Sequence, residues 1–247
     1  MPDLSVAEWV WAVAAAIGIG LSKSGFAGVG FFHILIFAWL FGPKSSTGML
    51  LPLLVVGDVA AVAVYRRHAR WDHVMKILPP SMIGVVVGWL LMERIVDAQY
   101  RPMIGTIVLG LTLLQILRLV KPQALERIPH SHAFALGLGL LAGTATMLAN
   151  AAGPIVALYL LAVALPKFEL VGTGAWFFLI INVFKLPFSW QQGLIDCDSL
   201  TLNAILAPVV PLGLLFGSWL IKHVPQRLFD LLLLIFAAVA SLRLLIG

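Results

Sequence analysis

Residues 19–30 read Ile19-Gly20-Leu21-Ser22-Lys23-Ser24-Gly25-Phe26-Ala27-Gly28-Val29-Gly30. Here a lysine, two serines and four glycines interrupt an apolar run that extends from about Val6 to Leu40. A shorter interruption, Asn150-Ala151-Ala152-Gly153-Pro154, lies inside a second apolar run. Apolar segments that are broken at matching places in two halves are typical of membrane transporters, which expose backbone to a substrate there. The sequence therefore predicts an integral membrane transporter whose site lies where the two interruptions meet.

The composition also indicates a membrane protein. Of the 247 residues, 61% are hydrophobic and 11% are charged, and the mean hydropathy is +1.03. A soluble domain of this length cannot bury so much apolar surface, so the lipid bilayer is the expected surrounding. The formal net charge is +5, but the cations lie in short connections between apolar runs, and we expect no nucleic-acid partner. The single cysteine, Cys197, excludes an internal disulfide and a multi-cysteine metal site, and we expect no metal or cofactor.

Ten apolar segments predict an all-α polytopic membrane protein. A full crossing takes about 20 residues, and the first, second, sixth and seventh segments are shorter. These four flank the two interruptions, so they are either short tilted crossings or the arms of re-entrant hairpins. The segments cover approximately residues 6–21, 26–41, 47–65, 74–92, 102–119, 132–148, 153–165, 171–190, 200–221 and 228–246.

The basic residues predict the orientation. If the segments alternate in direction, the connections after the third, fifth, seventh and ninth segments fall on one side, and most of the basic residues lie there. The positive-inside rule places this side in the cytoplasm and both termini in the periplasm of a multi-pass protein. The start, Met1-Pro2-Asp3, has no positively charged n-region, so we expect the first helix to be its own insertion signal. The basic residues of these connections are Arg66, Arg67, Arg70, Lys76, Arg118, Lys121, Arg127, Lys167, Lys222 and Arg227.

A weak internal repeat divides the chain into two halves. Residues 1–120 form the first membrane repeat, 121–131 a cytoplasmic connection, and 132–247 the second repeat. Each repeat has about five segments, and because five is odd the second must be inverted, with short or broken helices at the repeat starts. The pairs that match in order are Gly30 with Gly153, Pro43 with Pro166, Lys44 with Lys167, Gly48 with Gly172, Asp58 with Asn182, Gly84 with Gly213 and Gly88 with Gly217. The last two pairs have the small-xxx-small spacing that lets membrane helices pack closely.

The glycine-rich pattern of residues 18–30 resembles the first-half signature of the TauE/SafE-type sulfite exporter family. The related second-half pattern is found in Gly153-Pro154-Ile155-Val156-Ala157-Leu158-Tyr159 and Gly172-Thr173. The length, the two halves and the short loops fit this family over essentially the whole chain. The resemblance implies a secondary transporter that carries sulfite, sulfonates or related organic anions across the bacterial inner membrane.

The first interruption has the chemistry of an anion site. Glycines let the backbone approach a ligand, and a helix restarting near Gly25 presents unpaired N–H groups with a partial positive charge. Ser22 and Ser24 add hydroxyl donors, and Lys23 adds a full charge. The alternative is that Lys23 lies in a short cytoplasmic turn and only orients the first hairpin. The predicted substrate-binding residues are Ser22, Lys23, Ser24, Gly25, Gly28, Gly30, Asn150, Gly153 and Asn182.

Asp58 lies in the middle of an otherwise apolar segment and is the predicted coupling residue. A carboxyl group at that depth is a functional candidate by default, able to carry a proton or to pair with Lys23 when substrate is absent. The alternatives are a structural N-cap after a kink, or a neutral carboxyl group hydrogen-bonded to a neighbouring helix. Lys185 follows Asn182 by one turn, and either contacts substrate or extends its ammonium group to the membrane interface.

The role of His33, the kind of transport and the oligomeric state each leave alternatives open. His33 lies three residues after Gly30 and either lines the site or forms a hydrogen bond between helices. Ser24 with His33 could suggest an intramembrane serine hydrolase, but no triad spacing accompanies them, and we expect no enzyme. A passive anion channel of the same fold remains an alternative to a carrier driven by protons or membrane potential. The sequence also leaves open a homodimer.

Overall fold

The computed structural model describes residues 4–25, 29–120, 132–163 and 165–220, with four isolated positions further on. The predicted connection 121–131 and most of the tenth segment, 228–246, therefore lie outside the described residues. The described part is helical and contains no strand. Its helices are α1 (Val6–Lys23), α2 (Gly30–Phe41), α3 (Pro43–Tyr65), the short 3-10 helix η1 (Arg66–His68), α4 (Trp71–Arg94), α5 (Asp97–Val120), α7 (His132–Ala149), α8 (Gly153–Ala162), α9 (Lys167–Gln191), α10 (Cys197–Leu206) and α11 (Val209–Leu220).

Local sequence signals explain where several helices begin. Ser5 and Glu8 form a capping box at the start of α1, in which each side chain accepts from the other's backbone N–H. Asp196 caps α10 by accepting from the N–H of Ser199. Gly42, the single residue between α2 and α3, has a φ of +85°, which a side chain would disfavour. Pro43 then supplies the fixed φ that suits a first helical turn.

The lengths of the helices confirm an all-α polytopic membrane protein. Among the described residues, six helices are long and apolar enough to cross a membrane, and α10 with α11 would make a seventh if that pair, bent by 41°, is one span. α1 and α7, at 18 residues each, reach the length of a crossing, unlike the shorter first and sixth segments that we predicted. α2 and α8, at 12 and 10 residues, are too short.

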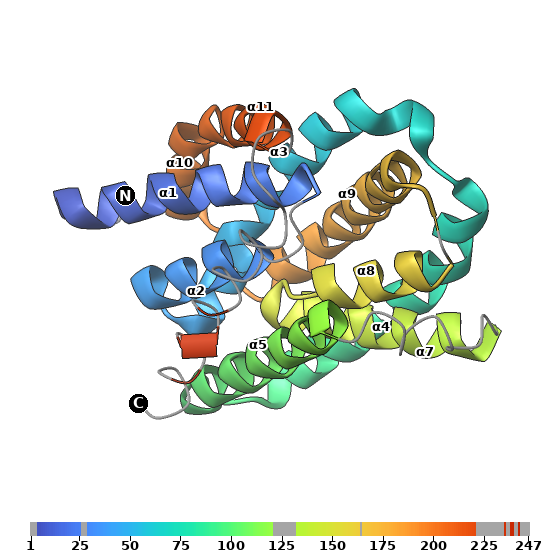
Figure 1. The fold of residues 1–247 in the computed structure, drawn as a ribbon. Helices are drawn as coiled ribbons and strands as arrows, with labels where there is room; N and C mark the ends of the chain where they lie inside the picture. The colour runs from blue at the N-terminus through green and yellow to red at the C-terminus, as the bar shows by residue number, and fades with distance from the viewer. Residues whose placement is uncertain are drawn as a thin grey trace.

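Three helix pairs form the body of the protein (Figure 1). α1 packs along α11, α4 packs along α7, and α3 packs against α9 between these two pairs. α3 also contacts α1 and α11, whereas α9 also contacts α4. Polar residues on the facing sides of α3 and α9 are therefore enclosed by the rest of the protein.

Glycines allow close packing within the two outer helix pairs, α1 with α11 and α4 with α7. A Cβ atom at Gly84 of α4 would collide with the carbonyl oxygen of Leu140 in α7, and one at Gly213 of α11 with the carbonyl oxygen of Ile17 in α1. This confirms the predicted role of the small-xxx-small pairs. The packing is reciprocal. α1, the first helix of the first half, packs on α11 of the second half, and α7, the first helix of the second half, packs on α4 of the first half. The inverted repeat itself stays a prediction.

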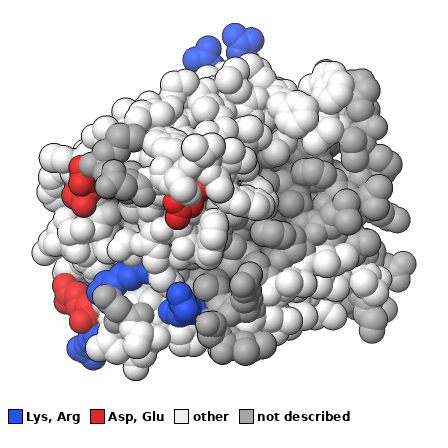
Figure 2. Space-filling model, turned by 90° about the vertical axis from the view of Figure 1, so that its left-hand side faces the viewer, with Lys and Arg blue, Asp and Glu red and all other residues white. Residues whose placement is uncertain are grey.

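The outer surface suits lipid. Large apolar side chains such as Val87, Leu90, Leu141 and Trp219 are exposed on the outer helices. On the face drawn in Figure 2, charged side chains are few and lie among a mostly uncharged described surface. Such a surface would be a liability in water and is expected where the surrounding solvent is hydrocarbon.

Candidate substrate site

A short helix begins at the end of each interruption. α1 ends at Lys23 and α2 begins at Gly30, five residues later than the restart that we predicted near Gly25. In the second half, α7 ends at Ala149 and α8 begins at Gly153. Neither short helix receives a side-chain cap from the described residues. First-turn N–H groups of such helices can bind an anion, although those of Phe32 and Val156 already donate to the carbonyl oxygens of Val29 and Ala152.

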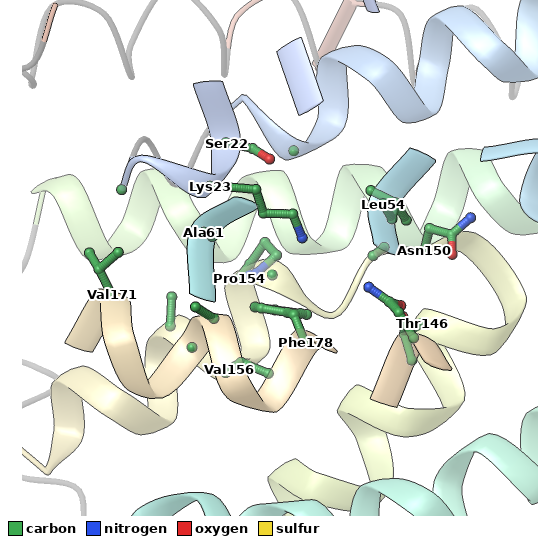
Figure 3. A pocket seen from close by; sticks show the side chains of 18 of the residues that line it. Ser22, Lys23, Leu54, Ala61, Thr146, Asn150, Pro154, Val156, Val171 and Phe178 are labelled. Carbon is green, nitrogen blue, oxygen red and sulfur yellow. The ribbon is translucent and has the colours of Figure 1, made fainter. Parts of the chain in front are cut away.

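One cavity of about 150 Å³ lies between the two interruptions (Figure 3). Residues of α1, α2, α3, α7, α8 and α9 form its wall. A Cβ atom at Gly30 or Gly153 would meet no atom within 4 Å, so both glycines leave their share of the wall open. An aliphatic and aromatic lining surrounds a few polar groups, which is the usual character of a small-molecule site. Seven predicted residues line it: Ser22, Lys23, Gly25, Gly30, Asn150, Gly153 and Asn182.

Two predicted residues are not placed in the wall. Gly28 lies outside the described residues. Ser24 is buried beside α11, where its side chain would collide with a Cβ atom at Gly217. The Ser24 hydroxyl donates to the carbonyl oxygen of Leu21, and the Ser22 hydroxyl donates to that of Ile19. In this conformation neither serine directs its proton into the cavity, contrary to the expectation that both act as donors there.

Lys23 and Asp58 form a buried ion pair. The Lys23 Nζ atom lies 2.6 Å from Asp58 Oδ1, and the two side chains are 11% and 0% exposed. Nζ also lies 4.8 Å from the centre of the Phe178 ring, a favourable place for a cation. Lys23 is therefore not a residue of an exposed turn. Asp58 lies inside α3 and does not cap a helix, and it pairs with Lys23, while its role in coupling stays a prediction.

Asn182 holds the other oxygen of Asp58. Its Nδ2 atom donates to Asp58 Oδ2 at 2.7 Å. These two residues correspond in the predicted repeat, and they meet where α3 packs against α9. Because the carboxylate accepts the amide N–H, the amide oxygen of Asn182 must face the other way.

Lys185 completes this arrangement, although it was not among the predicted site residues. It is 1% exposed, so the alternative in which it extends to the membrane interface is wrong. Its Nζ atom donates to Asn150 Oδ1 at 2.6 Å, to Thr146 Oγ1 at 3.1 Å and to Asn182 Oδ1 at 3.4 Å. The signal that could have found it is the spacing to Asn182, because residues three apart share one face of a helix. We name Lys23, Asp58, Thr146, Asn150, Asn182 and Lys185 the central cluster.

Asn150 connects the second interruption to the first half. It has a φ of +53°, a conformation that asparagine tolerates better than most residues. Its Nδ2 atom donates to the carbonyl oxygen of Thr47 in α3 at 2.8 Å, while its oxygen accepts from Lys185. The strained residue at the end of α7 is thus held from both sides.

His33 lines the cavity and is 3% exposed. Its Nδ1 atom has no hydrogen-bond partner among the described residues. Of the two alternatives for this residue, the structure favours the one in which it lines the site. A buried ring nitrogen without a partner is uncommon, and it is explained if a ligand or water supplies the missing bond.

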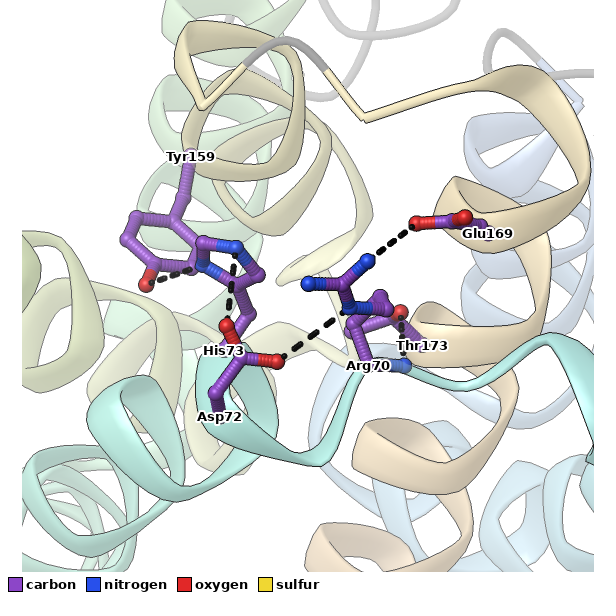
Figure 4. A network of polar contacts seen from close by, with 6 residues as sticks. All are labelled: Arg70, Asp72, His73, Tyr159, Glu169 and Thr173. Carbon is purple, nitrogen blue, oxygen red and sulfur yellow. Dashed lines mark hydrogen bonds and ion pairs between the residues drawn. The ribbon is translucent and has the colours of Figure 1, made fainter.

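A second group of polar residues lies where α4 begins (Figure 4). We name it the peripheral cluster: Arg70, Asp72, His73, Tyr159, Glu169 and Thr173. The Arg70 guanidinium lies 3.3 Å from Glu169 Oε2 and 3.5 Å from Asp72 Oδ1, and its backbone N–H donates to Thr173 Oγ1 at 3.0 Å. His73 lies 3.4 Å from both Asp72 Oδ2 and the Tyr159 hydroxyl. This cluster ties the first half to α8 and α9 without contributing to the cavity wall.

A comparison with known families agrees with these observations. Residues 12–244 match the family model described as Sulfite exporter TauE/SafE. The chain belongs to this family. No curated protein matches the sequence. As a TauE/SafE member the chain is a membrane transporter, and the resemblance of residues 18–30 is confirmed. Among the described residues, no three His, Cys, Asp or Glu side chains are grouped to hold a metal ion.

Proposed function

We propose that this chain is a secondary carrier that exports sulfite, a sulfonate or a related small organic anion, and that Lys23 binds it. The observation that carries the proposal is the buried ion pair at the cavity. Lys23 lines the wall, and its one anionic partner among the described residues is Asp58. A bound oxyanion would take the place of the carboxylate on the ammonium group, at a point where both short helices begin.

The surroundings of Lys23 favour an anion further. Gly30 and Gly153 begin helices whose N-terminal ends carry a partial positive charge of about half a unit each. Half-helices with their N-termini at an anionic group are a recurrent device of transporters built from two halves. The cavity of about 150 Å³ is adequate for a sulfur oxyanion with a short organic substituent.

Asp58 supplies a means of coupling. When its carboxylate binds a proton, it no longer competes for Lys23, and a doubly charged anion such as sulfite can bind there. When the proton leaves, the ion pair can re-form and displace the anion. Alternation of the two halves around this point, one exposed to each side in turn, would then link anion movement to proton movement.

The first experiment is thermal stabilisation of the detergent-purified protein by sulfite and methanesulfonate. Binding to the folded state raises the melting temperature by mass action. We expect both anions to stabilise the wild type and Asp58→Asn, which keeps Lys23, and to leave Lys23→Met unshifted. Lys76→Met, which removes an exposed cation outside the cavity, is the matched control and should respond like the wild type. Equal shifts for Lys23→Met and the wild type would refute the assignment of Lys23.

We further propose that the protein lies in the bacterial inner membrane with both termini in the periplasm. Cys197 tests this directly, because it is exposed at the start of α10 and is the only cysteine of the chain. In intact cells, a membrane-impermeant maleimide should label the wild type. A Cys197→Ser variant carrying Arg67→Cys should be labelled only after the membrane is permeabilised. The reverse pattern would place both termini in the cytoplasm.

A further inference from the structure

The central cluster brings a defined set of charges to the cavity. Lys23 of α1 pairs with Asp58 of α3, and Lys185 of α9 reaches the same carboxylate through Asn182. Residues 26–28, which lie outside the described residues, read Phe-Ala-Gly in the sequence and include no charged side chain. The uncharged members of the cluster are Thr146 of α7, Asn150 just after α7 and Asn182 of α9, and His33 of α2 lines the same cavity.

The oxygen atoms around Lys185 suit its charged form. Asn182 donates to Asp58 and Asn150 donates to the carbonyl oxygen of Thr47, so both amide oxygens must face the lysine. With the Thr146 hydroxyl, Lys185 has three oxygen partners. An ammonium group has three N–H donors and no acceptor, whereas a neutral amine has only two. The geometry therefore matches a charged Lys185.

Counted over the described residues, the cluster then carries one excess positive charge. Two ammonium groups face one carboxylate, and a further proton on His33 would place a third cation beside Lys23, which like-charge repulsion opposes. A buried charge without a counter-charge is unfavourable. The cavity therefore binds best a ligand whose charge brings the net charge of ligand and central cluster to zero.

We propose that the cavity is matched to a single negative charge, and this rests on the proposed function above. A monoanion, such as a sulfonate or hydrogen sulfite, binds without any proton. A dianion binds together with one proton from solution, which forms an O–H bond to the Asp58 carboxylate and leaves two cations to face two negative charges. The charge of the substrate, more than its shape, then decides whether its binding is coupled to a proton.

Two probes of fixed charge test this rule. Methanesulfonate is a monoanion and sulfate a dianion throughout the range from about pH 5.5 to about pH 8.5. Binding that takes up one proton weakens about tenfold for each unit by which pH rises above the pKa of the free group. By titration calorimetry, we expect the wild type to bind sulfate with this dependence and methanesulfonate with an affinity that changes less than about twofold over the whole range.

Two variants should move the pH dependence in opposite ways. Asp58→Asn removes the proton acceptor and raises the cluster's charge by one, so sulfate binding should become independent of pH. Lys185→Met lowers the charge by one, so methanesulfonate should acquire the tenfold dependence that sulfate has in the wild type. Lys76→Met should change neither dependence.

Equal pH dependence for the two probes in the wild type would overturn the proposal, and so would a dependence for sulfate that survives Asp58→Asn. Binding of sulfite and methanesulfonate without any binding of sulfate at acid pH would overturn the charge rule alone. Failure of the wild type to bind sulfite and both probes at every pH would contradict the proposed function as well.

Discussion

The central and peripheral clusters use similar side chains in opposite surroundings. Both join the first half of the chain to the second, and each contains a cation, a carboxylate and a hydroxyl group. In the central cluster Lys23 lies 2.6 Å from a carboxylate that is 0% exposed. In the peripheral cluster Arg70 lies 3.3 Å from Glu169, and these side chains are 51% and 31% exposed.

The difference shows that burial, and not the number of contacts, decides what an ion pair does. Water competes for exposed charges and salt screens them, so such pairs contribute about 0–1 kcal/mol. Removal of one partner from a buried pair leaves a charge without compensation and costs about 3–5 kcal/mol. The central cluster is therefore sensitive to any change in charge, as a substrate site must be, whereas the peripheral cluster tolerates change.

The largest expected effect is that of Lys23→Met on the unfolding free energy. Loss of the ammonium group leaves Asp58 buried and unpaired, and we expect a destabilisation of about 3–5 kcal/mol. The double variant Lys23→Met with Asp58→Asn should recover much of this loss, because the carboxylate that lost its partner is then gone, although Lys185 keeps its charge. Denaturant unfolding of the two single variants and the double variant, treated as a double-mutant cycle, measures the coupling. Additive effects would show that the pair is not formed.

Lys185→Met should have the next largest effect. It removes the donor to three buried oxygens, and an unsatisfied buried polar group costs about 1–3 kcal/mol. The amide of Asn182 would lose one of the contacts that orient it, but Asp58 would keep Lys23. We therefore expect a loss of about 2–3 kcal/mol in unfolding free energy. Lys185→Arg is the matched control for charge, and a loss as large as that of Lys185→Met would assign the effect to shape.

Much of the central cluster could be predicted from the sequence because charge is rare in an apolar segment. Lys23 and Asp58 interrupt long runs of hydrophobic residues, and few explanations other than a pair or a site exist for them. The repeat spacing also identified Asn182 as the counterpart of Asp58. The two then meet because α3 and α9 pack face to face.

What could not be predicted depends on the course of the chain between helices. Whether Ser24 faces the cavity depends on the residue at which α1 ends. The four glycines spread over residues 20–30 do not specify the residue at which α2 begins. Lys185 lies near Pro187 and the end of its segment, and a long side chain there could point either way. Only the hydrogen bonds from its ammonium group to Thr146 of α7 and to Asn150 decide the direction.

The smallest effect should come from the peripheral cluster. Arg70→Met breaks the contacts with Glu169 and Asp72, but water and salt replace them, so we expect a loss of about 0–1 kcal/mol in unfolding free energy. The loss should shrink further at high ionic strength, where a loss in Lys23→Met should persist because buried pairs are little screened. Glu169→Gln is the partner variant, and together with Arg70→Met it gives a second double-mutant cycle. A coupling as large as that of Lys23 with Asp58 would show that water does not reach the start of α4.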